Sequence, residues 1–384
     1  MYLIMLVNPL SLFLCSCIVI FFLSFFKEMT SSSASTSYYE TTDDEEFSKP
    51  VVTKSFFGIK YSNPPSFTTW KGLPTIMSLI RWFLFEKDDS HLPSKEFVAK
   101  ALPVITPKFD LTSKLSATWL GHATVFVQLE GLNIITDPVF SSRASPMFAM
   151  FFAGPKRYVK PPCPYEDLPP IHVGVISHNH YDHLDATAVV KISSLNPEMK
   201  WFVPLGVKKL MNSIVPGTEV IEKNWGEIEE FQMNGISYNV LCTPAQHWSQ
   251  RGLFDHNHTL WAGWAVMGPN YKFFYTGDTG FCEEEYKKLG NKYGPFQLAA
   301  IPIGCYCPRW IMQSQHINTE EAVLIHKHIK AENTIGIHWG TYLMGSNEPY
   351  LEPPKLFGEA ATKHGYDLKN LFTVRHGETW SYNP

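Results

Sequence analysis

The chain has 384 residues, of which 45% are hydrophobic and 18% are charged, and its formal net charge is −4. This size and hydrophobic content allow one large or two medium domains with a sizeable buried core. The acidic balance provides no basic footprint, which argues against a nucleic-acid partner. The seven cysteines lack the even, regular spacing of a disulfide framework, so we predict reduced thiols and a catalytic domain that faces the cytosol.

The N-terminal segment, residues 1–28, contains an uncharged apolar run over residues 2–26. The run is long enough to span a bilayer, and Lys27 at its C-terminal side favours a cytosolic catalytic domain. A cleaved signal sequence is the alternative, although no basic residue precedes the run. Residues 29–60 are Ser-rich and then acidic without apolar periodicity, which predicts a disordered linker.

Residues 61–110 form an apolar and amphipathic extension. Its densest part, residues 70–85, crowds aromatic and aliphatic side chains into a short segment with few charges. This composition predicts a helix that either lies on a membrane or a partner subunit, or packs on the core of the catalytic domain.

Residues 111–384 show the pattern of a catalytic domain with many short strands. Glu130-Gly131 predicts a hairpin between strands at residues 118–129 and 132–136. Further strands are expected at residues 173–177, 200–203, 236–241, 264–267, 273–276, 298–301 and 335–337. A helix is expected at residues 320–329 with Asn318 as its cap. Strands with interspersed helices predict an α/β sandwich.

Residues 178–183, His-Asn-His-Tyr-Asp-His, supply four potential metal ligands within six residues. His178 and His180 alternate by two, so an extended backbone points both to one side, whereas Asp182 and His183 follow a turn and can face a second point. Imidazole and carboxylate suit zinc or a similar divalent ion. Four ligands exceed what one ion needs, so we predict two ions that share a water.

Four further candidates follow predicted strands: Asp137, His247, Asp278 and His338. Loops at the ends of neighbouring strands converge on one edge of a sheet, where α/β proteins build their sites. We therefore expect these residues to join the cluster at residues 178–183.

With these ligands the chain resembles the metallo-β-lactamase superfamily. The resemblance implies an αβ/βα sandwich of two mixed sheets flanked by helices, with two zinc ions as cofactors. It implies that Asp137 orients the ligands from outside the metal pair. It also implies the following ligands: His178, His180 and His247 for one ion, Asp182, His183 and His338 for the other, and Asp278 as a bridge.

The sequence around the ligands is similar to the family of N-acyl-phosphatidylethanolamine-hydrolysing phospholipases D. The matching segments are residues 118–124, 135–138, 154–157, 177–185, 244–248 and 308–310. The resemblance covers residues 60–384 and implies cleavage of N-acylphosphatidylethanolamine to an N-acylethanolamine and phosphatidic acid, through a hydroxide shared by two zinc ions that attacks phosphorus. It further implies a membrane-associated homodimer at Golgi or endosomal membranes. The N-terminal apolar run departs from the family pattern.

Other residues of this pattern are candidates for substrate contact. By the resemblance, His316 lies near the substrate and hydrogen-bonds the phosphate or protonates the leaving oxygen; otherwise it only begins a helix. Asp278 is expected to orient the attacking hydroxide. Arg251 either pairs with phosphate or is a plain surface arginine. Tyr181 and Gln315 complete the expected substrate contacts.

A second apolar run suggests contact with a membrane surface. Met147, Phe148, Phe151 and Phe152 precede the cations of residues 156–157, an arrangement suited to an anionic lipid interface. A buried strand or helix is the alternative.

Three alternative functions remain open at this point. One is another phosphodiesterase or a lactonase of the same fold, and another is an RNA-processing nuclease, which the acidic balance disfavours. The third is a membrane-tethered lipid-binding scaffold without catalysis, which the complete ligand set disfavours.

Overall fold

The computed structural model describes residues 35–37, 46–56, 58–87, 92–146, 154–343 and 346–383. The expected N-terminal membrane segment, residues 1–28, lies outside these residues. So do the four expected membrane-contact residues Met147, Phe148, Phe151 and Phe152. Among the helices that are described, none combines the length and the apolar character needed to cross a bilayer.

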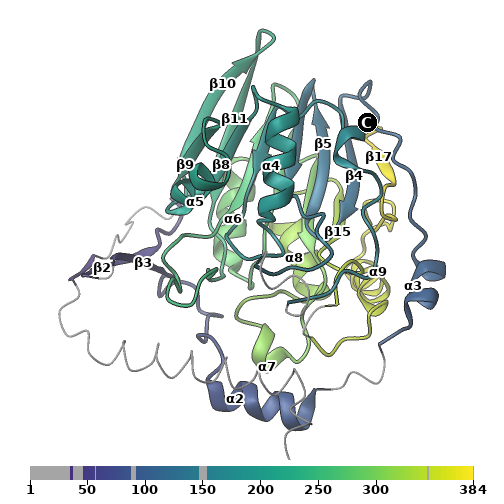
Figure 1. Ribbon diagram of the computed structural model, residues 1–384. Helices are drawn as coiled ribbons and strands as arrows, with labels where there is room; N and C mark the ends of the chain where they lie inside the picture. The colour runs from purple at the N-terminus through teal and green to yellow at the C-terminus, as the bar shows by residue number, and fades with distance from the viewer. Residues whose placement is uncertain are drawn as a thin grey trace, which may run out of the picture.

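Two seven-stranded mixed sheets form the centre of the fold (Figure 1). The first sheet has the order β17 (Thr379–Ser381), β4 (Leu115–Gly121), β5 (Thr124–Leu129), β6 (Leu132–Thr136), β7 (Val173–Val175), β8 (Lys200–Pro204), β9 (Glu219–Lys223). The second has the order β10 (Ile228–Met233), β11 (Ile236–Thr243), β12 (Gly263–Met267), β13 (Lys272–Tyr275), β14 (Leu298–Pro302), β15 (Thr334–Ile337), β16 (Leu371–Phe372). Apolar side chains of both sheets share one large core cluster.

Helices cover the outer face of each sheet. α4 (Ala186–Leu195) and α5 (Val207–Ile214) pack on the first sheet, and α6 (Glu283–Lys292), α8 (Thr319–His328) and α9 (Glu352–Lys363) pack on the second. Asn318 and Glu321 form a reciprocal capping box that begins α8, as the sequence predicted. The expected α/β sandwich of two mixed sheets flanked by helices is confirmed.

The strand expected over residues 118–129 is interrupted, and this part of the prediction was wrong. The chain turns between β4 and β5 at Gly121 and His122, which have positive φ angles of 112° and 53°. A left-handed residue cannot continue a strand, and the register of the pair shifts here. The result is that His122 occupies a tight turn at the end of β4.

The prediction of a disordered linker through residue 60 was also wrong for its C-terminal part. β2 (Val51–Ser55) and β3 (Gly58–Ser62) pair antiparallel and, with β1 (Ser35–Ser37), form a small third sheet. Phe47 is 5% exposed within the main core, and the backbone and hydroxyl of Ser48 both donate to Glu285 of α6. The buried contacts of Phe47 and Ser48 therefore fix a segment whose composition is polar.

The apolar extension packs on the catalytic domain through part of its surface, and its contact with a membrane or a partner subunit stays a prediction. α2 (Ile76–Arg81) continues into the π-helical turn η1 (Trp82–Glu86), and α3 (Lys95–Ala101) follows. Leu79 and Trp82 pack on a buried cluster beside α7 (Arg309–Met312). Met77, Leu84 and Phe85 are 73%, 59% and 81% exposed. One face of this helical segment thus packs on the domain while the other presents apolar side chains outward.

His326 on α8 predicts a pH dependence of folding. The side chain is buried, and its Nδ1 lies 2.8 Å from the hydroxyl oxygen of Thr334. Burial lowers its pKa from 6.5 to about 4. The unfolded chain therefore takes up this proton first, so the contribution to stability is complete above pH 6.5 and is lost as the pH falls towards 4.

We expect His326→Gln to reduce the stability difference between pH 7 and pH 5 by about 2 kcal/mol relative to wild type. Urea unfolding of both metal-free proteins at the two pH values measures this difference. Equal pH dependence in the two proteins would show that His326 does not act as a buried neutral group.

Candidate metal centre

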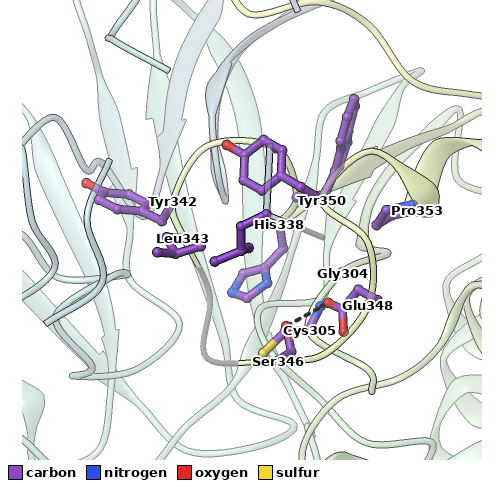
Figure 2. A pocket seen from close by; sticks show the side chains of 12 residues that line it. Gly304, Cys305, His338, Tyr342, Leu343, Ser346, Glu348, Tyr350 and Pro353 are labelled. Carbon is purple, nitrogen blue, oxygen red and sulfur yellow. Dashed lines mark hydrogen bonds between the residues drawn. The ribbon is translucent and has the colours of Figure 1, made fainter. Parts of the chain in front are cut away.

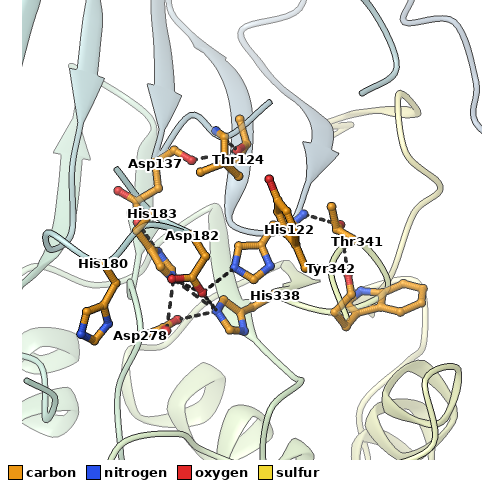
Figure 3. A network of polar contacts seen from close by, with 12 residues as sticks. His122, Thr124, Asp137, His180, Asp182, His183, Asp278, His338, Thr341 and Tyr342 are labelled. Atoms are coloured by element: carbon orange, nitrogen blue, oxygen red, sulfur yellow. Dashed lines mark hydrogen bonds and ion pairs between the residues drawn. The ribbon is translucent and has the colours of Figure 1, made fainter. Parts of the chain in front are cut away.

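The predicted ligands meet at one edge of the two sheets (Figure 3). Asp137 follows β6, and the ligand loop, residues 178–183, follows β7. His247, Asp278 and His338 follow β11, β13 and β15. Strand ends of both sheets thus bring residues from five separate segments together, as the sequence predicted.

The first cluster consists of His178, His180 and His247, whose donor nitrogens lie within 4.8 Å of one another. Nε2 of His178 is 2.8 Å from Nδ1 of His180. Burial lowers the pKa of all three imidazoles, and that of His180 falls to about 4. At neutral pH these rings are uncharged, with lone pairs available to a cation.

Partners on the far side of these rings support that role. Nδ1 of His247 faces the carbonyl oxygen of Gln315 at 3.0 Å, so this nitrogen carries the proton. Its Nε2 is buried and has no hydrogen-bond partner within the described part of the chain. Nδ1 of His178 lies 2.9 Å from the hydroxyl of Ser177. Outer partners of this kind fix the tautomer and orientation of metal-binding histidines.

The second cluster contains Asp182, His183 and His338. Nε2 of His183 is 3.2 Å from Nε2 of His338, and these nitrogens are 3.7 Å and 3.8 Å from Oδ2 of Asp182. Asp278 joins this group, because its Oδ2 is 3.1 Å from His183 and its Oδ1 is 3.2 Å from His338.

Charge in this cluster favours a cation. Burial by itself would raise the pKa of Asp182 and of Asp278, but the positive charge of His183 outweighs it and holds both well below 3.8. Burial likewise opposes protonation of His183, yet Asp278 and Asp182 raise its pKa well above 6.5. The buried carboxylate of Asp278 and the partly buried one of Asp182 thus require positive charge beside them, and divalent ions would supply it in place of protons. The residues fit a metal pair.

Asp137 lies behind the ligands and orients them. It is fully buried, and its Oδ2 is 2.6 Å from Nδ1 of His183. Its Oδ1 accepts the backbone N–H of Ser177 at 2.7 Å, and its Oδ2 also accepts the hydroxyl of Tyr275. A carboxylate on Nδ1 directs Nε2 of His183 towards the metal position.

His316 lies beside both clusters. Its ring centroid is 5.4 Å from that of His247 and 5.7 Å from that of His338. Its Nδ1 is 3.8 Å from Oδ2 of Asp278, and burial lowers its pKa to about 4. His316 therefore places a neutral ring next to the predicted reaction centre, as expected.

The three residues expected to contact substrate have internal partners instead. Arg251 donates from Nη1 to the carbonyl oxygens of Asn179 and Leu184, at 3.1 Å and 2.8 Å, and its guanidinium lies 4.0 Å from the ring centre of Tyr181. The hydroxyl of Tyr181 donates back to the carbonyl of Arg251. Gln315 accepts from the indole of Trp248 through its side chain. Arg251 thus braces the ligand loop through Nη1, and its contact with phosphate stays a prediction.

A small cavity of about 30 Å³ lies on the outer side of His338, large enough for a water molecule (Figure 2). Its lining includes Cys305, Glu348 and Tyr350. Glu348 accepts the backbone N–H groups of Cys305 and Cys307 at 2.5 Å and 3.0 Å.

All five cysteines in the described part of the chain are free thiols, as predicted.

The sequence did not identify His122 and Trp248 as parts of the site. His122 is fully buried against His338, with ring centroids 4.0 Å apart, and Trp248 lies against His180 at 4.4 Å. The strand predicted over residues 118–129 includes His122, so the sequence did not indicate a site residue at this position. Its position after an apolar run, like that of the other candidates, is the signal that would have revealed it.

Comparison with known proteins agrees with this geometry. Residues 132–339 match the beta-lactamase superfamily domain. The chain is 52% identical over 345 residues to N-acyl-phosphatidylethanolamine-hydrolyzing phospholipase D 1 of Caenorhabditis elegans, covering 87% of this chain and 95% of the nematode protein. It is 36% identical over 239 residues to the mitochondrial protein of that name from Saccharomyces cerevisiae, covering 62% of this chain and 49% of the yeast protein.

Solved structures show the same fold at low sequence identity. A possible metal-dependent hydrolase from Veillonella parvula has a TM-score of 0.54 at 18% identity, covering 71% of this chain and all of that protein. An isothiocyanate hydrolase from Delia radicum gut bacteria has a TM-score of 0.51 at 18% identity, covering 70% and 98%. With the sequence matches, these confirm the expectation of a hydrolase of this fold. The chain belongs to the beta-lactamase superfamily and, within it, to the family of N-acyl-phosphatidylethanolamine-hydrolysing phospholipases D.

Proposed function

We propose that this protein is a zinc-dependent phospholipase D that hydrolyses N-acylphosphatidylethanolamine to an N-acylethanolamine and phosphatidic acid. The observation that carries the proposal is the 52% identity to the nematode phospholipase, which extends over 95% of that protein. The two adjacent donor clusters, with Asp278 against His183 and His338 of the second, support hydrolysis that depends on a metal pair.

The electrostatics of the site require cations for this substrate. A phosphodiester is anionic, and it would have to approach the ionised carboxylates of Asp182 and Asp278, whose negative charge would repel it unless cations lie between them. When bound, two zinc ions neutralise the phosphate oxygens and lower the pKa of a shared water enough to make it a nucleophile at neutral pH. Asp278 faces His183 and His338 of the second cluster and lies near His316, so it is placed to orient the attacking group.

His316 is the candidate proton donor to the leaving alkoxide or a hydrogen-bond partner of the phosphate. Its ring is 11% exposed and adjoins both clusters, and its Nδ1 has no hydrogen-bond partner among the described residues. This nitrogen therefore stays available for a hydrogen bond with a substrate oxygen. The backbone carbonyl of His316 accepts from Arg309, which keeps the residue in place.

We expect His316→Phe to bind the same amount of zinc as wild type and to lower kcat by about 100-fold, within the range usual for a lost general acid. Steady-state kinetics on mixed micelles and metal analysis of the purified variant measure the two quantities. A variant that keeps wild-type kcat would remove His316 from the mechanism.

The whole proposal is tested by incubating the purified full-length chain with N-acylphosphatidylethanolamine and identifying the products by mass spectrometry. We expect an N-acylethanolamine and phosphatidic acid, no product after treatment with a chelator, and recovery when zinc is restored. Parallel incubations with bis(p-nitrophenyl) phosphate and an acyl-homoserine lactone examine the two other hydrolase classes. Hydrolysis of either with no release of N-acylethanolamine would overturn the proposal.

We further propose that the protein works as a homodimer at a membrane surface on the cytosolic side, at Golgi or endosomal membranes. The exposed Met77, Leu84 and Phe85 of the α2–η1 segment support contact with lipid. Co-sedimentation with phospholipid vesicles and light scattering of the purified chain test the two parts of this proposal.

A further inference from the structure

His122 lies at the turn between β4 and β5, directly beside Asp182 and His338 of the second cluster (Figure 3). Its side chain is fully buried, and its ring lies 4.0 Å from that of His338 and 5.3 Å from that of Tyr342, centre to centre. Its donor nitrogen lies within 4.8 Å of the donor atoms of Asp182, His183 and His338. Neither the expected ligand set nor the mechanism above uses this histidine.

The side chain of His122 contacts a ligand directly. Its Nε2 is 3.2 Å from Oδ2 of Asp182, the oxygen that also faces His183 and His338. This distance suits a hydrogen bond in which the imidazole N–H donates to the carboxylate. A carboxylate held in this way cannot rotate freely, so the position of its oxygens is set before a cation arrives.

The other ring nitrogen shows which tautomer the site favours. Nδ1 of His122 has no hydrogen-bond partner among the residues that the structure describes. Nδ1 of His183 and of His247 each face an oxygen, as is usual for histidines that bind metal through Nε2. A buried N–H without an acceptor is rarer than a buried acceptor without a donor. The proton of His122 therefore belongs on Nε2, which makes this ring a donor to Asp182 and not a metal ligand.

The backbone of His122 is tied to a second ligand. Its carbonyl oxygen accepts the N–H of His338 at 2.9 Å, and its own N–H donates to the hydroxyl of Thr341 at 2.6 Å. The backbone at His122 is left-handed, with φ of 53°, a conformation that is unfavourable for a residue with a side chain. Such strain persists only where surrounding contacts hold it, and it concentrates at functional sites.

We propose that His122 is a positioning residue of the second metal subsite, because it donates its Nε2–H to Asp182 and holds the backbone of His338. Two ligands from different sheets thereby keep a constant separation. The inference rests on the proposed function only in requiring that the chain binds two metal ions.

The test is a metal titration of the metal-free full-length protein with Zn²⁺ and with Co²⁺. His122→Phe keeps a ring of similar size but removes the donor, and His122→Gln keeps an N–H at similar reach. We expect His122→Phe to bind the first ion like wild type and the second about 10- to 100-fold more weakly, the range usual for an outer-shell partner. We expect His122→Gln to recover most of this loss and, at saturation, to show the visible Co²⁺ spectrum of wild type.

His326→Gln is the matched control, because His326 is also a buried histidine but lies on α8, away from the ligands. It should bind both ions like wild type. If His122→Phe does not fold, His122→Asn replaces it, since the shorter amide cannot reach Asp182.

Two results would overturn the inference. Wild-type affinity for the second ion in the variants without the donor would show that Asp182 needs no such support. An altered Co²⁺ spectrum in saturated His122→Gln would show that His122 is itself a ligand. The titrations use no lipid, so a chain that binds two ions but does not hydrolyse N-acylphosphatidylethanolamine would refute the proposed function alone.

Discussion

Replacing Asp278 with Asn is expected to lower kcat on N-acylphosphatidylethanolamine by about 1000-fold or more, which corresponds to about 4 kcal/mol of transition-state stabilisation. Asp278 is 4% exposed, and its two oxygens face Nε2 of His183 and Nε2 of His338 at 3.1 Å and 3.2 Å. The amide keeps the shape of the side chain but removes its negative charge and turns one oxygen into a donor. It therefore removes a carboxylate that faces two ligands of the second cluster.

Metal analysis and steady-state kinetics of Asp278→Asn measure this effect, with less than two zinc ions bound per chain expected. His178→Ala is the companion variant, because it removes a ligand of the first cluster. Asp367→Asn is the matched control, since its carboxylate is exposed beside Lys369 and far from the site in sequence and in contacts. If both site variants turn over substrate at the wild-type rate, the metal-dependent mechanism is wrong.

Asp137→Ala is expected to destabilise the fold by about 3–5 kcal/mol, the usual cost of removing one partner from a buried charged network. The carboxylate is fully buried and accepts from the backbone and hydroxyl of Ser177, from Nδ1 of His183 and from the hydroxyl of Tyr275. The substitution leaves these donors without an acceptor in the interior. It also frees the ring of His183, so zinc affinity should fall.

Urea unfolding of chelator-treated protein separates the loss of stability from the loss of metal. Asp137→Asn should lose less stability than Asp137→Ala, because its amide oxygen still accepts one hydrogen bond. Asp110→Ala is the control, because the carboxylate of Asp110 accepts hydrogen bonds from Ser113 and Ser381 at the surface. We expect it to reduce stability less than either Asp137 variant does. Equal losses for Asp110→Ala and Asp137→Ala would show that burial of the Asp137 network adds nothing.

The predictions that held were those that depend on local patterns. Short apolar runs bounded by turn residues gave most of the strand positions, because side-chain alternation is a property of neighbouring residues. The pattern did not predict the strands Glu219–Lys223 and Ile228–Met233, because both lie at an edge of a sheet and contain charged, partly exposed residues. Phe47 and Ser48 explain the error in the linker, because Tyr293, which stacks on Phe47, and Glu285, which accepts from Ser48, lie more than 200 residues away.

By itself, the sequence determined the class of fold, the concentration of ligands in residues 178–183 and their family resemblance, because ligand spacing and strand periodicity are local. Only the tertiary structure decided which residues support those ligands. His122 meets Asp182 across 60 residues, and Arg251 braces the ligand loop across 67 to 72 residues. Such pairs depend on which strands are neighbours and on what is buried between them, and no local pattern records either.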